Sequence, residues 1–252
     1  MTGIGRRTVR LEHRLTRPNA TLRELDEALA LAAVHGMAAI TVNPWLVKAA
    51  RRSMGRSGMR LGTVIGYPHG GQVLAVKAFE ASKALEQGAN QIDFVMNGGA
   101  LASREEEVVV NDMLAVVEMA HSALATAGVI IEAEPMDDEL IRRACRLAER
   151  AGADHVVTST GDASARGAAR RVALMRDSVG PRMAIKASAR FRAIGDLRSA
   201  AAAGATWISA PFTTGLAEAA ANRFGPTELP SSPPPRRSAF PAARPQIASR
   251  AG

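Results

Sequence analysis

The chain has 252 residues, of which 47% are hydrophobic and only 4% aromatic, so it can bury one large core of small and branched side chains. Its net charge of +8 gathers at the ends, because residues 1–19 carry +4 and residues 225–252 carry +3. The near-neutral body disfavours nucleic-acid binding, the lone Cys145 excludes an intrachain disulfide, and no apolar run is long enough to span a membrane. The N-terminus lacks the apolar block of a secretory signal, and we expect a cytoplasmic protein.

Short runs rich in Val and Ile alternate with longer amphipathic stretches, as in repeated βα units. Thr21 with Glu24 and Ser103 with Glu106 have the spacing of capping boxes at helix starts. We predict strands at 11–13, 38–42, 61–65, 91–96, 129–133, 155–159, 183–187 and 206–210. We predict helices at 21–35, 44–55, 72–88, 104–127, 137–151, 164–178 and 193–203. A glycine stands where four of these helices would end: Gly36, Gly88, Gly152 and Gly204.

Eight such alternations predict an α/β fold, a single closed (β/α)8 TIM barrel over residues 8–224. A doubly wound open sheet is the rival, and it lacks the glycine-rich phosphate motif after its first strand. We expect residues 1–7 to form an N-terminal extension. Residues 225–252 are rich in Pro and Arg and cannot build a core, so we expect this C-terminal tail to be disordered.

Lys186 is the strongest candidate for amine chemistry, because it interrupts a strand otherwise made of Ala and Ile. A buried lysine needs either a lowered pKa or a charged partner. In a parallel barrel the active site forms at the C-terminal ends of the strands, where carboxylates and one amine would suit proton transfer around a carbonyl. The ionisable residues expected there are Glu12, His13, His69, Asp93, Glu132, Glu134, Asp162, Lys186, Arg190 and Arg192.

Several fragments, taken in order, are similar to those of one known family. Leu11-Glu12-His13 is similar to an opening Leu-Asp-His, and residues 41–44 and 64–70 resemble Cys-Val-Asn-Pro and Val-Ile-Gly-Phe-Pro runs. Residues 91–101, 130–132 and 158–161 match further segments. Together they resemble the deoxyribose-phosphate aldolase family, in which the segment like 91–101 holds a proton-relay aspartate, here Asp93. The resemblance spans about three quarters of the chain and implies a barrel enzyme with imine chemistry.

The departures from the family pattern lie at positions that the resemblance assigns to catalysis and phosphate binding. The position of the imine-forming lysine is Val157, whereas the family's second active-site lysine matches Lys186. The glycine pair that helps to hold substrate phosphate is Ala189-Arg190, and the late Gly-x-Ser-Ser segment is replaced by residues 209–212. Asp162 adds a negative charge where a phosphate would approach. We therefore expect phosphorylated aldehydes to bind poorly, unless Arg190 or Arg192 replaces the lost contacts.

The resemblance implies three catalytic residues: Asp93, Lys186 and Glu12. It implies a second set of residues that bind the substrate: Asn43, Glu132, Thr158, Ser159, Thr160, Ser188 and Arg190. No cofactor and no metal are expected. A purely structural role stays open for two of these residues, since Asp93 and Lys186 could be a buried ion pair. His155 shares the strand parity of Val157 and is expected to be a hydrogen-bonded core histidine rather than a catalytic one.

The leading hypothesis is a divergent aldolase-like lyase that makes or breaks a carbon–carbon bond in a specialised small carbonyl substrate. Lys186 would act as the amine nucleophile or as an electrostatic partner. One alternative is a catalytically inactive barrel that binds a metabolite or a protein partner, and another is an imine-independent lyase or cyclase that uses carboxylates. No nucleic acid or membrane partner is expected, and a homodimer stays open.

Overall fold

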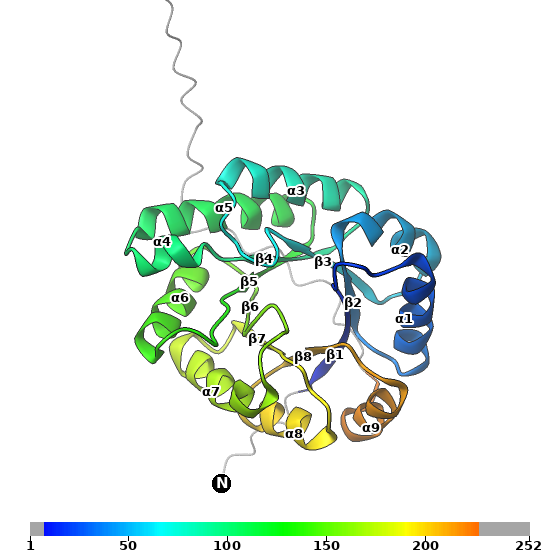
Figure 1. Cartoon of the computed structure of the whole chain (residues 1–252). Helices are drawn as coiled ribbons and strands as arrows, with labels where there is room; N and C mark the ends of the chain where they lie inside the picture. Colours follow the sequence, from blue (N-terminus) through cyan, green and yellow to red (C-terminus); the bar gives the residue numbers. More distant parts are fainter. Residues whose placement is uncertain (1–7, 227–252) are drawn as a thin grey trace, which may run out of the picture.

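The computed structural model describes residues 8–226. Its eight parallel strands close into a barrel in chain order, with the helices in a ring outside (Figure 1). This confirms the predicted (β/α)8 barrel. The predicted N-terminal extension and all but the first two residues of the predicted tail lie outside the described residues. The strands are β1 (Arg10–Leu15), β2 (Ala39–Val42), β3 (Arg60–Ile65), β4 (Gln91–Val95), β5 (Thr126–Ile130), β6 (His155–Val157), β7 (Ala184–Ser188) and β8 (Trp207–Ala210).

The helices return the chain to the N-terminal end of the barrel after each strand. Polar caps start several of them: Thr21 and Glu24 form the predicted capping box of α1, and Asp137 accepts the Leu140 N–H at the start of α6. The helices are α1 (Leu22–Val34), α2 (Val47–Met54), α3 (Leu74–Glu86), α4 (Gly98–Ala102), α5 (Glu106–Ser122), α6 (Asp138–Arg150), α7 (Ala168–Ser178), α8 (Ile194–Ala202) and α9 (Thr214–Phe224), with 3-10 turns at Pro44–Leu46 and Ala165–Gly167.

Several elements differ from the sequence prediction, and one of them, α4, is absent from the predicted helices. β5 begins at Thr126 rather than at 129, because α5 ends at Ser122. Ser103 does not cap α5, whose N-cap is Glu105 without a side-chain hydrogen bond. α9 is also absent from the predicted helices, although Thr213 caps it and its sequence is rich in Ala. The four glycines expected at helix ends all have positive φ.

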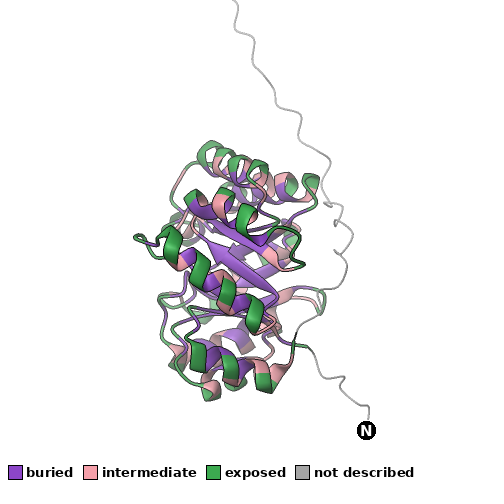
Figure 2. Cartoon of the chain, turned by 90° about the vertical axis from the view of Figure 1, so that its right-hand side faces the viewer, coloured by how far each residue is buried: buried purple, intermediate pink, exposed green. Residues whose placement is uncertain are grey.

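The main core lies between the outer face of the sheet and the helices (Figure 2). The strands are buried on both faces, whereas the helices expose one side to solvent. Of the helices in residues 8–226, none combines the length and apolar content needed to cross a membrane. The fold therefore encloses a second, inner set of side chains that points into the barrel, and the candidate site is built from it.

The kinds of side chain that point into the barrel differ between its N-terminal end, its middle and its C-terminal end. Arg10, Arg60 and Trp207 begin their strands at the N-terminal end, and the Arg10 guanidinium lies 5.5 Å from the centroid of the Trp207 ring. The middle holds a charged network around Lys186, whose ammonium lies 5.5 Å from the same centroid. Polar loop residues and an arginine, Arg14, lie at the C-terminal end.

Candidate active site

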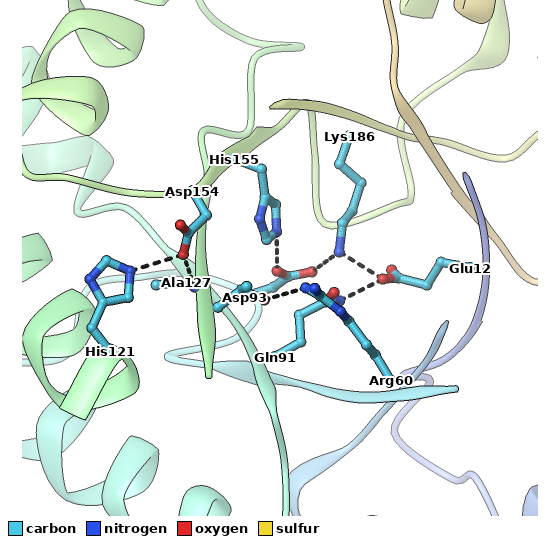
Figure 3. A network of polar contacts seen from close by, with 10 residues as sticks. Glu12, Arg60, Gln91, Asp93, His121, Ala127, Asp154, His155 and Lys186 are labelled. Atoms are coloured by element: carbon cyan, nitrogen blue, oxygen red, sulfur yellow. Dashed lines mark hydrogen bonds and ion pairs between the residues drawn. The ribbon is translucent and has the colours of Figure 1, made fainter. Parts of the chain in front are cut away.

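Lys186 lies at the centre of the barrel and is held by two carboxylates (Figure 3). Its ammonium donates to Glu12 Oε2 at 2.7 Å and to Asp93 Oδ2 at 2.6 Å. These three residues come from β7, β1 and β4, and each is at most 3% exposed. Gln91 also donates to Glu12 Oε2 at 2.6 Å. We call Glu12, Gln91, Asp93, His155 and Lys186 the ion network. The structure thus brings the three predicted catalytic residues together.

Within the ion network, the surrounding charges favour the ionised forms of Lys186 and Asp93. Burial alone would lower the pKa of Lys186, but the charges and hydrogen bonds of Asp93 and Glu12 outweigh it and raise that pKa above its ordinary value. Burial would raise the pKa of Asp93, but Lys186 and His155 hold it well below its usual range. Lys186 is therefore an ammonium at neutral pH, and an ammonium has no lone pair with which to attack a carbonyl.

His155 points into the barrel and contacts the oxygen of Asp93 that Lys186 does not. Its Nε2 lies 2.7 Å from Asp93 Oδ1, and the side chain is buried, as expected for a hydrogen-bonded core histidine. The imidazole occupies the space beside Gly128 on the neighbouring strand, where any Cβ would overlap it. Gly128 is therefore the residue that makes room for this contact.

Val157 lies in an apolar setting that offers no amine. It pairs in register with Lys186 on the next strand. Its side chain belongs to a small cluster inside the barrel, which we call the inner apolar cluster: Val64, Val95, Ile130 and Val157, with Tyr67 packed against it. The cluster contains the position that the family resemblance assigns to an imine-forming lysine.

Four of the predicted substrate-binding residues brace the loop that follows β6. Thr158 Oγ1 and Ser159 Oγ donate to the carbonyl of Ser188 at 3.0 and 2.7 Å, and the Ser188 N–H donates back to Thr158 Oγ1 at 2.9 Å. Glu132, whose φ is 54°, accepts the N–H of Thr160 at 2.8 Å. These contacts fix the loop, so Thr158, Ser159, Ser188 and Glu132 position it in the structure.

Arg14 covers the C-terminal end of the barrel above the ion network. Its Nη1 donates to the carbonyl of Thr160 at 3.2 Å and to Ser188 Oγ at 2.5 Å, and its Nη2 donates to the carbonyl of Gly161 at 3.0 Å. The Tyr67 hydroxyl donates to the same Thr160 carbonyl at 2.9 Å. Burial lowers the pKa of Arg14 without removing its charge. The Arg14 guanidinium and the Tyr67 hydroxyl are thus hydrogen-bond donors held in fixed positions at this end of the barrel.

A cavity of about 1110 Å³ opens at this end of the barrel, and we call it the mouth cavity. It contains three of the predicted substrate-binding residues: Asn43, Thr160 and Arg190. Glu12, Asp93 and Lys186 are not among the described residues that line it. The lining residues are His13, Arg14, Leu15, Thr16, Arg17, Pro18, Glu24, Glu27, Ala28, Leu31, Asn43, Tyr67, Pro68, Thr160, Asp162, Arg190, Pro211, Phe212, Thr213 and Thr214.

Arg14 and Tyr67 are absent from the residues that the sequence predicts for the site. One signal could have found Arg14: it has the same strand parity as Glu12, so both side chains point into the barrel. Its partners Thr160 and Ser188 are 146 and 174 residues away, and only barrel closure brings them together. In residues 8–226, no three His, Cys, Asp or Glu side chains are grouped so that they could hold a metal ion.

The sequence matches one family along most of the barrel. The family described as DeoC/LacD family aldolase matches residues 8–188. The deoxyribose-phosphate aldolase of Lysinibacillus sphaericus is 40% identical over 200 residues, which cover 79% of this chain and 89% of that protein. The protein of the same name from Streptococcus gordonii is also 40% identical over 200 residues, with coverage of 79% and 90%.

Solved structures give the same result. The structure named QR15, an aldolase, superposes with a TM-score of 0.78 at 30% identity and covers 88% of this chain and 98% of that chain. The deoxyribose phosphate aldolase of Aeropyrum pernix, described as a tetramer, superposes with a TM-score of 0.76 at 30% identity and covers 83% of this chain and 88% of that chain.

Proposed function

Because this chain belongs to the DeoC/LacD family of aldolases, we propose that it makes or breaks a carbon–carbon bond beside the carbonyl group of a small substrate, and that it does so without an imine. The observation that carries the proposal is that neither position 157 nor position 186 offers a free amine. Position 157 is a valine in an apolar cluster, and the Lys186 ammonium is held by Glu12 and Asp93. Lys186 then acts as a fixed charge, one of the two roles that the sequence left open for it.

The guanidinium of Arg14 is the group best placed to polarise a substrate carbonyl. Three of its five N–H groups bind Thr160, Gly161 and Ser188, and within residues 8–226 the other two have no hydrogen-bond partner. Arg14 lines the mouth cavity together with the Tyr67 hydroxyl and the Asp162 carboxylate. A cation held in place by fixed hydrogen bonds stabilises a developing oxyanion without reorganisation.

The cleavage reaction can be written with these groups. Asp162 takes the proton of the substrate hydroxyl, the O–H electron pair forms a new C=O bond, and the carbon–carbon bond breaks. Its electron pair passes through the α carbon to the carbonyl oxygen, which becomes an enolate beside Arg14. The proton then returns to the α carbon, so one hydroxyl-carbonyl compound gives two carbonyl compounds.

The charges of the mouth cavity favour a substrate without a phosphate. Three arginines line it, Arg14, Arg17 and Arg190, and three carboxylates oppose them: Asp162, Glu24 and Glu27. Arg17 is also paired with Glu24. A cavity with no net positive charge gives little driving force for binding a phosphate dianion. The specialised substrate therefore carries its carbonyl and hydroxyl groups on an uncharged skeleton.

A second candidate function is binding without turnover. It is favoured by one observation: Lys186 is 1% exposed and is not among the described residues that line the mouth cavity. In that case the barrel holds a carbonyl compound, and the ion network serves only its stability.

The test combines borohydride trapping with detection of products. The protein is incubated with small hydroxyaldehydes and hydroxyketones, carbon–carbon cleavage is followed by NMR, and parallel samples are reduced and mapped by mass spectrometry. We expect cleavage without an adduct, and at least a hundredfold loss of cleavage in Arg14→Gln. The control Arg192→Gln changes an exposed arginine outside the cavity and keeps full activity.

Each other result has a definite meaning. An adduct on Lys186 that disappears in Lys186→Met contradicts the imine-free proposal. Saturable binding of the same compounds with no cleavage supports the binding-only candidate. Deoxyribose 5-phosphate that binds more tightly than the uncharged compounds, with binding lost in Arg190→Ala, overturns the statement about phosphate.

A further inference from the structure

Four side chains form a layer at the N-terminal end of the barrel, the end away from the mouth cavity. In a (β/α)8 barrel, alternate strands contribute the four inward-pointing side chains of each layer. The first residue of each odd-numbered strand stands two positions before a residue that points inward, as Arg10 does before Glu12, so it points inward as well. We call these first residues the basal layer: Arg10, Arg60, Thr126 and Ala184.

The contacts of the basal layer bring its two arginines together. Nη1 of Arg60 donates to Thr126 Oγ1 at 3.2 Å, and the Arg60 side chain points into the barrel (Figure 3). Burial lowers the pKa of Arg60, and the nearby charge of Arg10 lowers it further. Both guanidiniums keep their charge at neutral pH. Two like charges therefore lie close to each other at this end of the barrel.

The basal layer is in contact with solvent, whereas the next layer toward the ion network is closed. All four basal side chains are half-buried. The side chains of the next layer are at most 6% exposed, and they come from the even-numbered strands: Ala39, Gln91, His155 and Trp207. A dissolved ion can therefore reach the basal layer without any opening of the barrel, and it meets a closed surface behind it.

Neither arginine of the basal layer has a carboxylate partner among residues 8–226. The carboxylates whose charges reach Arg60 are Asp154 and Glu12, and these are paired with His121 and Lys186 instead. A pair of unneutralised guanidiniums in a partly desolvated position favours a bound anion.

Several donors of the basal layer are free for such an anion. Within residues 8–226, Nη1 and Nη2 of Arg10 and Nε and Nη2 of Arg60 make no hydrogen bond, and none of these four atoms is buried. The Thr126 hydroxyl accepts from Arg60 and keeps its own proton to donate. The layer thus offers two charged forks and one hydroxyl to a single ligand.

We infer that the basal layer binds a phosphate dianion, either the free ion or the terminal phosphate group of a small compound, between the guanidiniums of Arg10 and Arg60. The paired N–H groups of a guanidinium match two oxygens of a phosphate, and a dianion replaces the repulsion between the two arginines by two attractions. The site lies at the opposite end of the barrel from the mouth cavity, so it is independent of the proposed function.

The experiment titrates the full chain with inorganic phosphate by isothermal titration calorimetry. We expect saturable binding of one phosphate per chain, competition by sulfate, and weaker binding as the ionic strength rises. Arg10→Gln and Arg60→Gln should each weaken phosphate about tenfold or more. Arg56→Gln is the matched control, because it removes an exposed arginine from the loop before β3 at the same end of the barrel, and it should bind as the parent does.

Two milder variants keep the test valid if a glutamine variant fails to fold. Thr126→Val removes the hydroxyl and keeps the shape of the side chain, and it should weaken phosphate about tenfold, the value of one hydrogen bond to a charged group. Arg60→Lys keeps the charge and loses the fork, so its affinity should lie between those of the parent and Arg60→Gln. Denaturant unfolding checks that each variant is folded.

Heat that does not saturate with phosphate or sulfate overturns the inference, and so does equal weakening by Arg56→Gln and Arg60→Gln. Binding that is kept in Arg10→Gln but lost in Arg190→Ala places the phosphate in the mouth cavity and also overturns it. Deoxyribose 5-phosphate separates the two sources of phosphate. Binding of this ester that is lost in Arg60→Gln supports a terminal phosphate group as the ligand, whereas binding of the inorganic ion alone supports the free ion.

Discussion

At the scale of single residues, Lys186 is a charge whose removal leaves two buried carboxylates without a cation. Replacing it in Lys186→Met should lower the free energy of unfolding by about 3–5 kcal/mol, the usual cost of breaking a buried ion pair. Denaturant unfolding measures this cost. Lys48→Met, at an exposed lysine on α2, should change stability by less than about 0.5 kcal/mol. Equal small effects at both positions would show that the ion network contributes little.

Val157 allows the opposite experiment, in which an amine is added. A lysine at position 157 would lie in the inner apolar cluster beside the Lys186 ammonium, and both surroundings lower its pKa. We expect Val157→Lys to form a borohydride-reducible adduct with acetaldehyde at neutral pH, at position 157 and at least tenfold faster than the parent. Peptide mass mapping identifies the site.

The control for this experiment is Val108→Lys, at an exposed position of α5. Its amine keeps the basicity of a solvated lysine and should label slowly at neutral pH. Labelling at 157 that is no faster than at 108 would contradict the expected effect of the barrel interior.

At the scale of elements, β5 and β6 depend on the pairing of Gly128 with His155. Gly128→Ala forces the imidazole away from its position against Asp93 and should cost about 1–3 kcal/mol in unfolding free energy. Gly195→Ala, near the start of α8, meets no atom within 4 Å and should be neutral or stabilising by up to about 1 kcal/mol. A Gly128→Ala protein as stable as Gly195→Ala would mean that the imidazole has room to move.

The barrel and the pairing of Asp93 with Lys186 could be predicted from the sequence, because both follow from local pattern and strand order. Lys186 and Asp93 each lie in an apolar run, and two opposite charges in one small barrel interior must meet. α9 could also have been predicted, since Thr213 and the Ala-rich stretch after it are ordinary helix signals. The contacts of Arg14 could not be predicted from the sequence, because its partners come from the far side of the closed barrel.

The mouth cavity was equally beyond sequence prediction. Its shape depends on how far α1 lies from the loop before α9, and side-chain pattern does not determine that spacing. The roles of Thr158, Ser159 and Ser188 show the same limit: the sequence marks them as substrate-binding residues, and the structure adds that each braces the loop over β6.

At the scale of the whole molecule, His13 makes stability depend on pH. Its pKa is lowered from 6.5 to about 4 in the folded protein, so between these values the unfolded chain binds more protons than the folded one. Stability is therefore full above about pH 6.5 and falls as the pH drops toward 4, by about 3 kcal/mol in total for this group. Asp93, with its lowered pKa, contributes in a different window, below about pH 4.

The measurement is denaturant unfolding at a series of pH values from 7 to 4. His13→Gln removes the titrating ring and should flatten the curve over this interval. His69→Gln changes an exposed histidine and should keep the parent's slope. Parallel curves for the parent and His13→Gln would show that His13 is protonated as readily in the folded protein as in the unfolded chain.

Trp207 gives the molecule an optical reporter of its own interior. The indole is 6% exposed and lies 5.5 Å from both Arg10 and Lys186, measured from the ring centroid, whereas Trp45, the other tryptophan, is 57% exposed. A buried indole emits at shorter wavelength than a solvated one, and a cation near its face alters its emission. Fluorescence from the buried ring should therefore respond when the central charges rearrange, and quenching by a dissolved anion should act mainly on Trp45. The two emissions separate events in the centre of the barrel from events at its surface.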